Sequence, residues 1–397
     1  MTSQNFDKQS QRVARRGEPA RGTLSAQRDC GRRAGRAPAA TGPAALKILF
    51  ITRAWGQHAG GLERLSFELI QAISQNPRVS VQVIKHTGAR ITSPLFVFSC
   101  LPRALAAARH ADVVHISDPM LSLAGWLIKE IFHKPIAVNV HGLDITYPSF
   151  LYQTYLKLFF RHFDAYFPIS RHVNTLLDHW QVSGTQIVVS PGINDRFFDP
   201  SITRPQLGSF LNMSLTGRKV LLTVGRLIKR KGHAWFISNV LPKLASNTLY
   251  VIAGQGPEAN NIKQSALLHQ VSNRVILLGK VSDLNLKILY NTVDAFVQPN
   301  IKIRYDTEGF GLVLLEAALC RRPVFAADID GVPDAIQDNK NGILVESNNP
   351  PAWINALNSL PSSVINSRAY TLANFSWEKA ADRYWPALAK LPATPPS

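Results

Sequence analysis

Residues 306–319 read Asp-Thr-Glu-Gly-Phe-Gly-Leu-Val-Leu-Leu-Glu-Ala-Ala-Leu. From Leu312 onward every side chain except Glu316 is apolar, which predicts a helix that is buried on all sides. An isolated carboxylate is rarely tolerated in such surroundings, so Glu316 needs a hydrogen-bond donor. Gly309 and Gly311 let the backbone pass close to a bound group, and the unpaired N–H groups of the first helical turn favour an anion there.

The two carboxylates of this run, Glu308 and Glu316, lie on either side of the glycines. Glu316 follows Gly311 by five residues, which corresponds to about 7.5 Å along a helix. A carboxylate accepts hydrogen bonds from paired hydroxyls, so a ligand with a polyol at each end and a phosphate between them fits this spacing. A nucleotide-sugar has that layout. A capped core helix with Glu308 in its first turn is the alternative interpretation.

The run resembles the E-x7-E element of the family 4 retaining glycosyltransferases. That family has the α/β GT-B fold, in which two Rossmann-like domains with doubly wound parallel sheets face each other. The resemblance implies that Glu308 is a catalytic residue that orients the donor sugar, and that Glu316 binds the ribose hydroxyls. It also implies that Gly309, Phe310 and Gly311 contact the donor diphosphate.

Length and composition agree with a globular chain of two to three domains, because 46% of the 397 residues are hydrophobic and 18% are charged. Cys30, Cys100 and Cys320 lie far apart and form no C-x-x-C pair, so neither a disulfide framework nor a structural zinc site is indicated. The formal net charge of +18 suggests an anionic partner, which could be nucleic acid, an acidic membrane leaflet or a phosphorylated substrate.

The first 45 residues differ in composition from the rest. They contain one lysine and eight arginines against three acidic residues, and almost no large apolar side chains, so we expect a disordered basic leader at 1–45. Because the fold-like sequence begins abruptly at Leu46, a later translation start is a further hypothesis. We expect an N-terminal acceptor-side domain at 46–200, a C-terminal donor-side domain at 201–374, and a C-terminal helix at 375–391 that joins the first domain, as in the family.

Strands and helices alternate in the first domain. Buried runs at 47–52, 79–85, 112–116 and 136–140 predict a doubly wound parallel sheet, in which ligands bind at the carboxyl ends of the strands. After the first strand, Gly60 and Gly61 open a helix and could form an anion site, although such a pair is more often a turn. His141-Gly142-Leu143-Asp144 follows the strand at 136–140 and is similar to the family's H-G-x-D/E motif. The resemblance implies that His141 is a catalytic residue beside the donor sugar and that Gly60 and Gly61 face the diphosphate.

The stretch 147–163 is aromatic and basic and contains no acidic residue. Such a stretch could lie on an anionic membrane surface, but a core helix between two strands is the interpretation we favour. No uncharged apolar run reaches the roughly 18 residues of a membrane-spanning helix, so any membrane attachment would be peripheral.

The second domain begins after an irregular stretch at 195–218, which we expect to be the interdomain linker. A buried strand at 219–224 leads into Gly225-Arg-Leu-Ile-Lys-Arg-Lys-Gly232, which is similar to the family's G-R-x4-K-G motif. The resemblance implies that Arg226 and Lys231 hold the diphosphate, while Lys229 and Arg230 are expected on the surface. It further implies that the backbone around Val281 contacts the base.

The resemblance implies a glycosyltransferase that moves a hexosyl group from a UDP- or GDP-linked sugar to a hydroxyl of a glycan or lipid-linked acceptor, with retention, in cell-surface polysaccharide synthesis. No metal or other cofactor is required if basic side chains and the helix start stabilise the diphosphate. We expect a cytoplasmic protein at the inner face of the membrane. The alternatives are a nucleotide-sugar epimerase on the same frame, or a basic membrane-binding or, less favoured, nucleic-acid-binding protein with a vestigial site.

Overall fold

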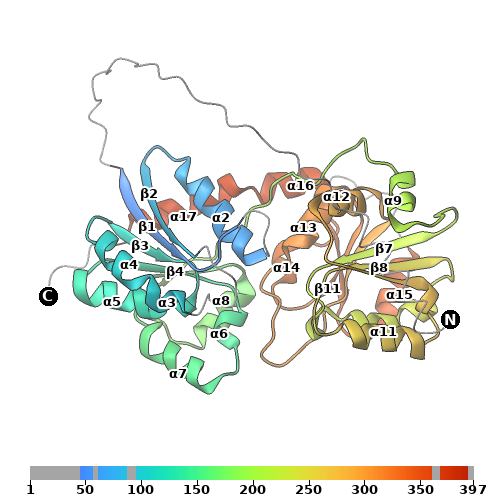
Figure 1. Cartoon of the computed structure of the whole chain (residues 1–397), viewed down its shortest axis with the longest axis horizontal. Coiled ribbons are helices and arrows are strands. Elements are labelled where there is room, and N and C mark those ends of the chain that lie inside the picture. Colours follow the sequence, from blue (N-terminus) through green and yellow to red (C-terminus); the bar gives the residue numbers. More distant parts are fainter. Residues whose placement is uncertain (1–44, 57–60, 87–94, 360–366, 392–397) are drawn as a thin grey trace, which may run out of the picture.

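The computed structural model describes residues 45–56, 61–86, 95–359 and 367–391. They form two six-stranded sheets, all parallel, each flanked by helices, and the two halves lie side by side and meet at an interface (Figure 1). The expected α/β architecture with two doubly wound parallel sheets is confirmed. The leader at 1–44 and Gly60 lie outside the described residues.

The first sheet has the strand order β2-β1-β3-β4-β5-β6. Its strands are β1 (Leu46–Thr52), β2 (Val79–Lys85), β3 (Val113–Ile116), β4 (Ile136–Val140), β5 (Ala165–Pro168) and β6 (Thr185–Gln186). Successive side chains of β1 point to opposite faces of the sheet, and both faces are covered, which explains why this strand is apolar almost throughout. Ile48 and Phe50 pack in one buried cluster, and Leu49 and Ile51 in another.

The second sheet has the order β12-β11-β10-β7-β8-β9. Its strands are β7 (Lys219–Val224), β8 (Thr248–Ala253), β9 (Val275–Gly279), β10 (Ala295–Gln298), β11 (Val324–Asp328) and β12 (Ile343–Glu346). The chain reverses its direction of winding between β7 and β10, and ligands of such sheets bind at the carboxyl ends of the strands beside that point. The Arg226–Lys231 segment follows β7, and the Glu308 loop follows β10.

The helices of the N-terminal half are α2 (Gly61–Ser74), α3 (Phe96–Ser99), α4 (Leu101–Ala108), α5 (Ser122–Phe132), α6 (Leu143–Thr146), α7 (Phe150–Phe159) and α8 (Arg171–Asp178). Those of the C-terminal half are α9 (Arg204–Leu211), α10 (His233–Asn239), α11 (Ala259–Leu268), α12 (Asp283–Thr292), α13 (Leu312–Leu319), α14 (Val332–Ala335), α15 (Pro350–Asn358) and α16 (Ser367–Asn374). The last helix, α17 (Trp377–Ala389), returns to the N-terminal half and lies against α2 (Figure 1).

Helix α17 is held by aromatic and polar contacts with the first sheet. Tyr384 stacks on Phe167 of β5 with ring centroids 4.0 Å apart, and its hydroxyl lies 3.0 Å from Nε2 of His115 in β3. His115 is almost fully buried, and burial lowers its pKa to about 3, so the ring is neutral at physiological pH. His115 therefore has a structural partner in the N-terminal half.

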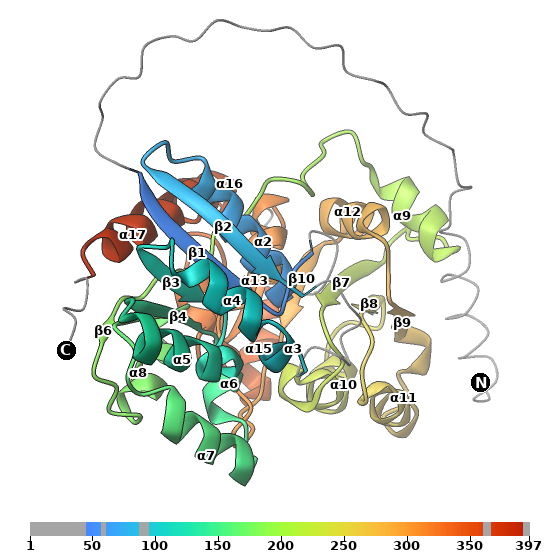
Figure 2. The ribbon, with the colours of Figure 1, turned by 60° about the vertical axis from the view of Figure 1, so that its left-hand side comes forward.

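One expectation about local structure was wrong. The stretch at 195–218 is not irregular throughout, because Thr203 and Gln206 form a capping box that starts α9. The stretch at 147–163 contains the expected helix between two strands, and Leu156 and Phe160 pack in the core, but Phe150 and Leu151 are exposed (Figure 2 shows α7 at the edge of the N-terminal half).

The chain crosses between the two halves twice, once near Ile193 and once near Phe375, and the two crossing segments, which we call the two passages, contact each other. The backbone N–H of Ile193 donates to the carbonyl of Phe375 at 2.7 Å. A Cβ atom added to Gly192 would lie 2.4 Å from the backbone N of Trp377, so glycine is required for this close approach. The two passages therefore form one connection rather than two separate ones.

Candidate active site

Glu308 lies at the centre of a buried charged cluster behind the carboxyl ends of β7 and β10. Its Oε2 lies 2.6 Å from Nζ of Lys231 and 3.3 Å from a terminal nitrogen of Arg230, and it accepts a hydrogen bond from the Asn300 side chain at 3.0 Å. Arg230 also donates to the carbonyl of Thr307 at 3.1 Å. Two chain segments that follow neighbouring strands thus meet at one carboxylate, as the sheet topology requires.

The charged side chains in this cluster change one another's pKa. Burial alone would raise the pKa of Glu308, but the neighbouring Lys231 and Arg230 hold it at about 2, so the carboxylate is ionised. Burial lowers the pKa of Lys231, and the Glu308 carboxylate opposes that change. The cluster therefore holds an ionised carboxylate in contact with two buried basic side chains.

The expected surface position of Arg230 was wrong. Residues Lys229–Lys231 form a single 3-10 turn that directs Arg230 and Lys231 into the protein together, while Lys229 stays exposed. The predicted diphosphate ligand Arg226 is exposed at the start of the same segment. It is close enough for its charge to lower the pKa of Lys231. Lys231 and Arg226 are therefore near one another, but of these two residues only Lys231 contacts Glu308.

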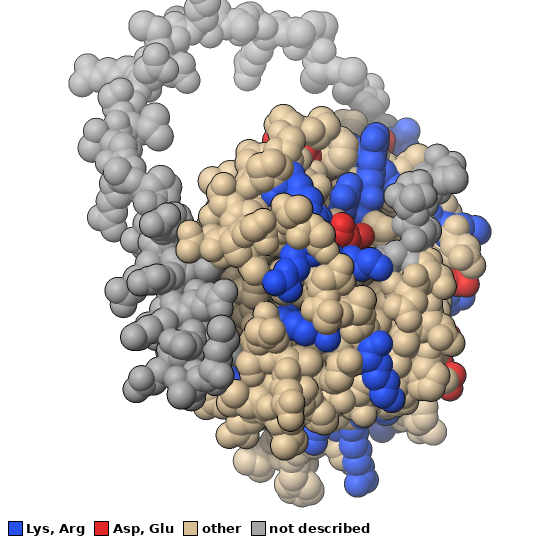
Figure 3. All heavy atoms as spheres, turned by 90° about the vertical axis from the view of Figure 1, so that its right-hand side faces the viewer, with Lys and Arg blue, Asp and Glu red and all other residues tan. Residues whose placement is uncertain are grey.

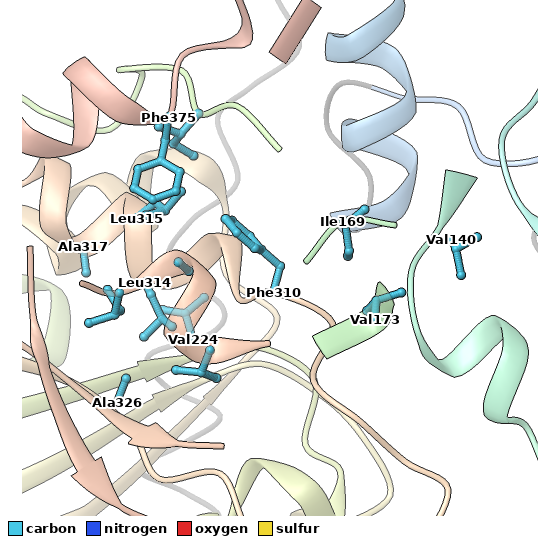
Figure 4. Close-up of a cluster of buried hydrophobic side chains, with 14 of the residues drawn as sticks. Val140, Ile169, Val173, Val224, Phe310, Leu314, Leu315, Ala317, Ala326 and Phe375 are labelled. Carbon is cyan, nitrogen blue, oxygen red and sulfur yellow. The ribbon is translucent and has the colours of Figure 1, made fainter. Parts of the chain in front are cut away.

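Helix α13 begins at Leu312, and Gly311 precedes it in the left-handed region at φ 100°. Glu308 therefore lies outside the helix, which excludes the alternative that placed it in the first turn. The Phe310 side chain is buried and lies 6.0 Å from the Phe375 ring, centroid to centroid (Figure 4), so only its backbone could contact a ligand. Beside Gly311, Gln298 is fully buried at the end of β10, and neither amide atom has a partner among the described residues.

The Glu308 loop meets the His141 loop of the N-terminal half. A Cβ atom added to Gly309 would lie 2.2 Å from the carbonyl oxygen of His141, so the two backbones are in direct contact. The His141 ring donates from Nε2 to the carbonyl of Ser117 at 3.0 Å. Asp144 accepts hydrogen bonds from the backbone N–H groups of His141 and Gly142, which fixes this turn. The structure therefore brings His141 and Gly309 together, with the imidazole directed into the N-terminal half.

Glu316 has the donors that the sequence required, which confirms that expectation. Arg64 of α2 donates to its Oε1 at 2.7 Å, and the Tyr290 hydroxyl donates to its Oε2 at 2.7 Å. Arg64 and Glu316 come from opposite halves, and their side chains are 12% and 7% exposed. The expected ribose ligand is thus engaged in an interdomain ion pair.

Of the remaining predicted site residues, Gly61 and Val281 have no described contact with the Glu308 cluster, and Gly60 lies outside the described residues. Gly61 is the first residue of α2, and a Cβ atom there would meet nothing within 4 Å. Val281 is half-buried just beyond β9. Sequence reasoning missed Arg64, Tyr290 and Asn300, and it placed Arg230 on the surface. Two of these four residues lie near motifs that the sequence offered, because Arg64 follows Gly61 by three residues and Arg230 belongs to the segment 225–232.

Two family models match the chain. One, described as glycosyl transferases group 1, matches residues 212–376, and the other, described as a glycosyl transferase 4-like domain, matches residues 11–192. The chain belongs to this family of glycosyltransferases and is an enzyme of the transferase class.

Curated relatives are similar to this chain in sequence, and solved structures are similar to it in fold. A D-inositol 3-phosphate glycosyltransferase of Salinispora tropica is 26% identical over 72% of this chain and 66% of its own length. A GDP-mannose-dependent alpha-(1-6)-phosphatidylinositol monomannoside mannosyltransferase of Mycolicibacterium smegmatis is 26% identical over 76% of this chain and 80% of its own. The structure of HepE from Anabaena in complex with UDP has a TM-score of 0.69 at 17% identity, covering 87% of this chain and 100% of that one. Sucrose-phosphate synthase from Thermosynechococcus elongatus has a TM-score of 0.68 at 19% identity, covering 87% and 99%.

Proposed function

We propose that this enzyme transfers a hexosyl group from a UDP- or GDP-linked sugar to a hydroxyl of a glycan or lipid-linked acceptor, with retention of the anomeric configuration. The observation that carries the proposal is the Glu308 cluster, in which an ionised carboxylate, Lys231 and Arg230 meet beside the start of α13. The buried and unpartnered amide of Gln298 beside Gly311 supports a polar ligand at this point.

In the proposed reaction Glu308 accepts hydrogen bonds from hydroxyls of the donor sugar. Lys231 shifts from Glu308 to the diphosphate, Arg226 contacts the same group, and the N–H groups at the start of α13 complete the anion site. These groups stabilise the negative charge that develops on the leaving diphosphate, so the proposal includes no metal. Among the described residues there is no group of three His, Cys, Asp or Glu side chains that could hold a metal ion.

Retention is proposed to follow a front-face displacement. The bond between the anomeric carbon and the diphosphate oxygen breaks, the acceptor oxygen bonds to the same face of that carbon, and the acceptor proton moves to the departing phosphate oxygen. A double displacement would need a second carboxylate as nucleophile. Asp144, the carboxylate of the His141 turn, instead accepts backbone hydrogen bonds.

The acceptor and the location belong to the same proposal. We place the enzyme in the cytoplasm, in peripheral contact with the inner face of the membrane, acting in cell-surface polysaccharide synthesis. Within the described residues no helix is long and apolar enough to cross a bilayer.

Calorimetry with UDP, GDP and their hexose derivatives tests donor binding, and NMR of the product tests the anomeric configuration. We expect one of the two nucleotides to bind and Glu308→Gln to abolish transfer while the protein remains folded. The matched control is Lys229→Gln, because Lys229 is exposed beside the cluster. An inverted product would refute retention, and an epimer formed from donor alone would favour the epimerase.

A further inference from the structure

Helix α7 has apolar side chains on both its inner and its outer face. Leu156 and Phe160 are buried in the N-terminal half, as a helix that covers a sheet requires. On the opposite side Phe150 is 83% exposed, Leu151 79% and Leu158 59%. With Thr154 and Lys157 they recur at the spacing of one helical face, and we call these five residues the α7 outer face.

Exposed apolar side chains of this size are informative when they lie together. Tyr147, just before α7, is 54% exposed. In the C-terminal half, Tyr305 is 49% exposed, and the loop that carries it is joined to α6 by a hydrogen bond from the Thr146 hydroxyl to the Tyr305 carbonyl at 3.1 Å. Exposed aromatic side chains therefore also lie between α7 and the interface of the two halves. Contiguous surfaces of this kind mark protein or membrane contacts.

Charge favours a membrane as the occupant. From 145 to 163 the sequence contains Lys157, Arg161 and His162 and no acidic residue. Lys157 is exposed and has no ion-pair partner among the described residues. Arg304 adds a cation over the Tyr305 ring at 4.7 Å. Phenylalanine, leucine and tyrosine flanked by lysine and arginine match the composition of surfaces that lie at the headgroup boundary of anionic bilayers.

Positive charge alone does not identify this face. Figure 3 shows lysine and arginine side chains spread over the flank of the C-terminal half as well. What distinguishes α7 is the combination of these cations with bulky apolar side chains that point outward.

We propose that the α7 outer face docks on the surface of an anionic lipid bilayer. The inner side of the same helical segment is bonded to the His141 loop, because the Tyr152 hydroxyl donates to the carbonyl of Asp144 at 2.9 Å. Docking therefore places the N-terminal half, which is the proposed acceptor side, at the lipid surface, where a lipid-linked hydroxyl would be presented. This last step rests on the proposed transferase function, whereas the docking itself does not.

The test is sedimentation of the full-length protein with vesicles of phosphatidylcholine alone or of an equal mixture with phosphatidylglycerol. We expect binding to the anionic vesicles only, weakened by salt. Phe150→Ser combined with Leu151→Ser should lower the vesicle partition coefficient at least tenfold, and Lys157→Glu should lower it several-fold. The matched control is Leu268→Ser combined with Leu284→Ser, which removes two leucines that are 79% and 68% exposed on α11 and α12.

Equal vesicle binding by the wild type and the double-serine variant of α7 would overturn the proposal, as would equal losses in that variant and in its control. A wild type that ignores vesicles but forms a dimer, which the double-serine variant dissociates, would assign the face to a second copy of this chain. Nucleotide calorimetry on the same variants separates the two proposals. Intact nucleotide binding with lost vesicle binding supports docking, whereas vesicle binding without nucleotide binding leaves docking intact and refutes the transferase site.

Discussion

The ion pair between Arg64 and Glu316 predicts a large difference between two interdomain substitutions. Replacing Arg64 by Met leaves the 7%-exposed Glu316 carboxylate with Tyr290 as its remaining donor. Breaking a buried pair by removal of one partner costs about 3–5 kcal/mol. We expect the lower end, about 3 kcal/mol, because Tyr290 still donates and the charge of Arg196 lies within interaction range of Glu316.

The matched control is Arg171→Met. Arg171 also joins the two halves, with its Nε 2.6 Å from Oδ1 of Asp334, but its side chain is 71% exposed. Such a pair contributes about 0–1 kcal/mol because water screens it and the side chain loses entropy on ordering. A loss of 3 kcal/mol corresponds to a fall in Tm of roughly 6–12 °C for domains of this size, so the two variants should be well separated.

Thermal unfolding followed by circular dichroism measures both variants, and the double variant Arg64→Met with Glu316→Gln completes the comparison. Because the second change removes the uncompensated charge, we expect it to recover at least half of the lost Tm. Equal Tm values for Arg64→Met and Arg171→Met, or no recovery in the double variant, would contradict the conclusion that burial makes the Arg64–Glu316 pair important for stability.

Three further predictions concern ionisation and close packing. The folded-state pKa of Glu308 is lowered to about 2, so ionisation of this carboxyl group stabilises the fold above about pH 4.5, and the contribution is lost as the pH falls towards 2. The difference in urea midpoint between wild type and Glu308→Gln should therefore shrink over that pH range. A difference that stays constant would contradict this prediction. Burial lowers the pKa of His233 to about 3, so the protein loses stability as the pH falls from about 6.5 towards 3, where this histidine must take up a proton on unfolding. Over that range a plot of the free energy of unfolding against pH should be less steep for His233→Gln than for the wild type, by the slope that corresponds to about one proton. Gly309→Ala should lower the Tm because its Cβ would clash with the His141 carbonyl, whereas Gly61→Ala should leave the Tm unchanged; equal values would argue against the loop contact.

The strands and the donor-side motifs could be predicted because they depend on local sequence. The buried strand at 219–224 coincides with β7, and the need of Glu316 for a donor followed from the apolar residues around it. The identity of that donor could not be derived, because Arg64 is 252 residues away along the chain. Only the packing of the two halves brings them together.

Two other features of the structure could not be predicted from the sequence, and each has a simple physical cause. In a run of four cations the composition does not reveal which side chains point inward, and the 3-10 turn at Lys229–Lys231 reversed the expectation for Arg230. In α7 both faces are apolar, so periodicity could not separate the buried face from the exposed one. In both cases the orientation of the segment is set by tertiary contacts.

The paired chain passages at Ile193 and Phe375 restrict how the enzyme can open. Since their backbones are hydrogen-bonded to each other, the chain joins the two halves at one place, and a relative movement of the halves would be largely a rotation about that place. Helix α6, whose Thr146 bonds to Tyr305, lies at the opposite end of the interface from α16 (Figure 1), so this contact would separate further than those beside the connection. Reactants would then exchange through the α6 end of the interface.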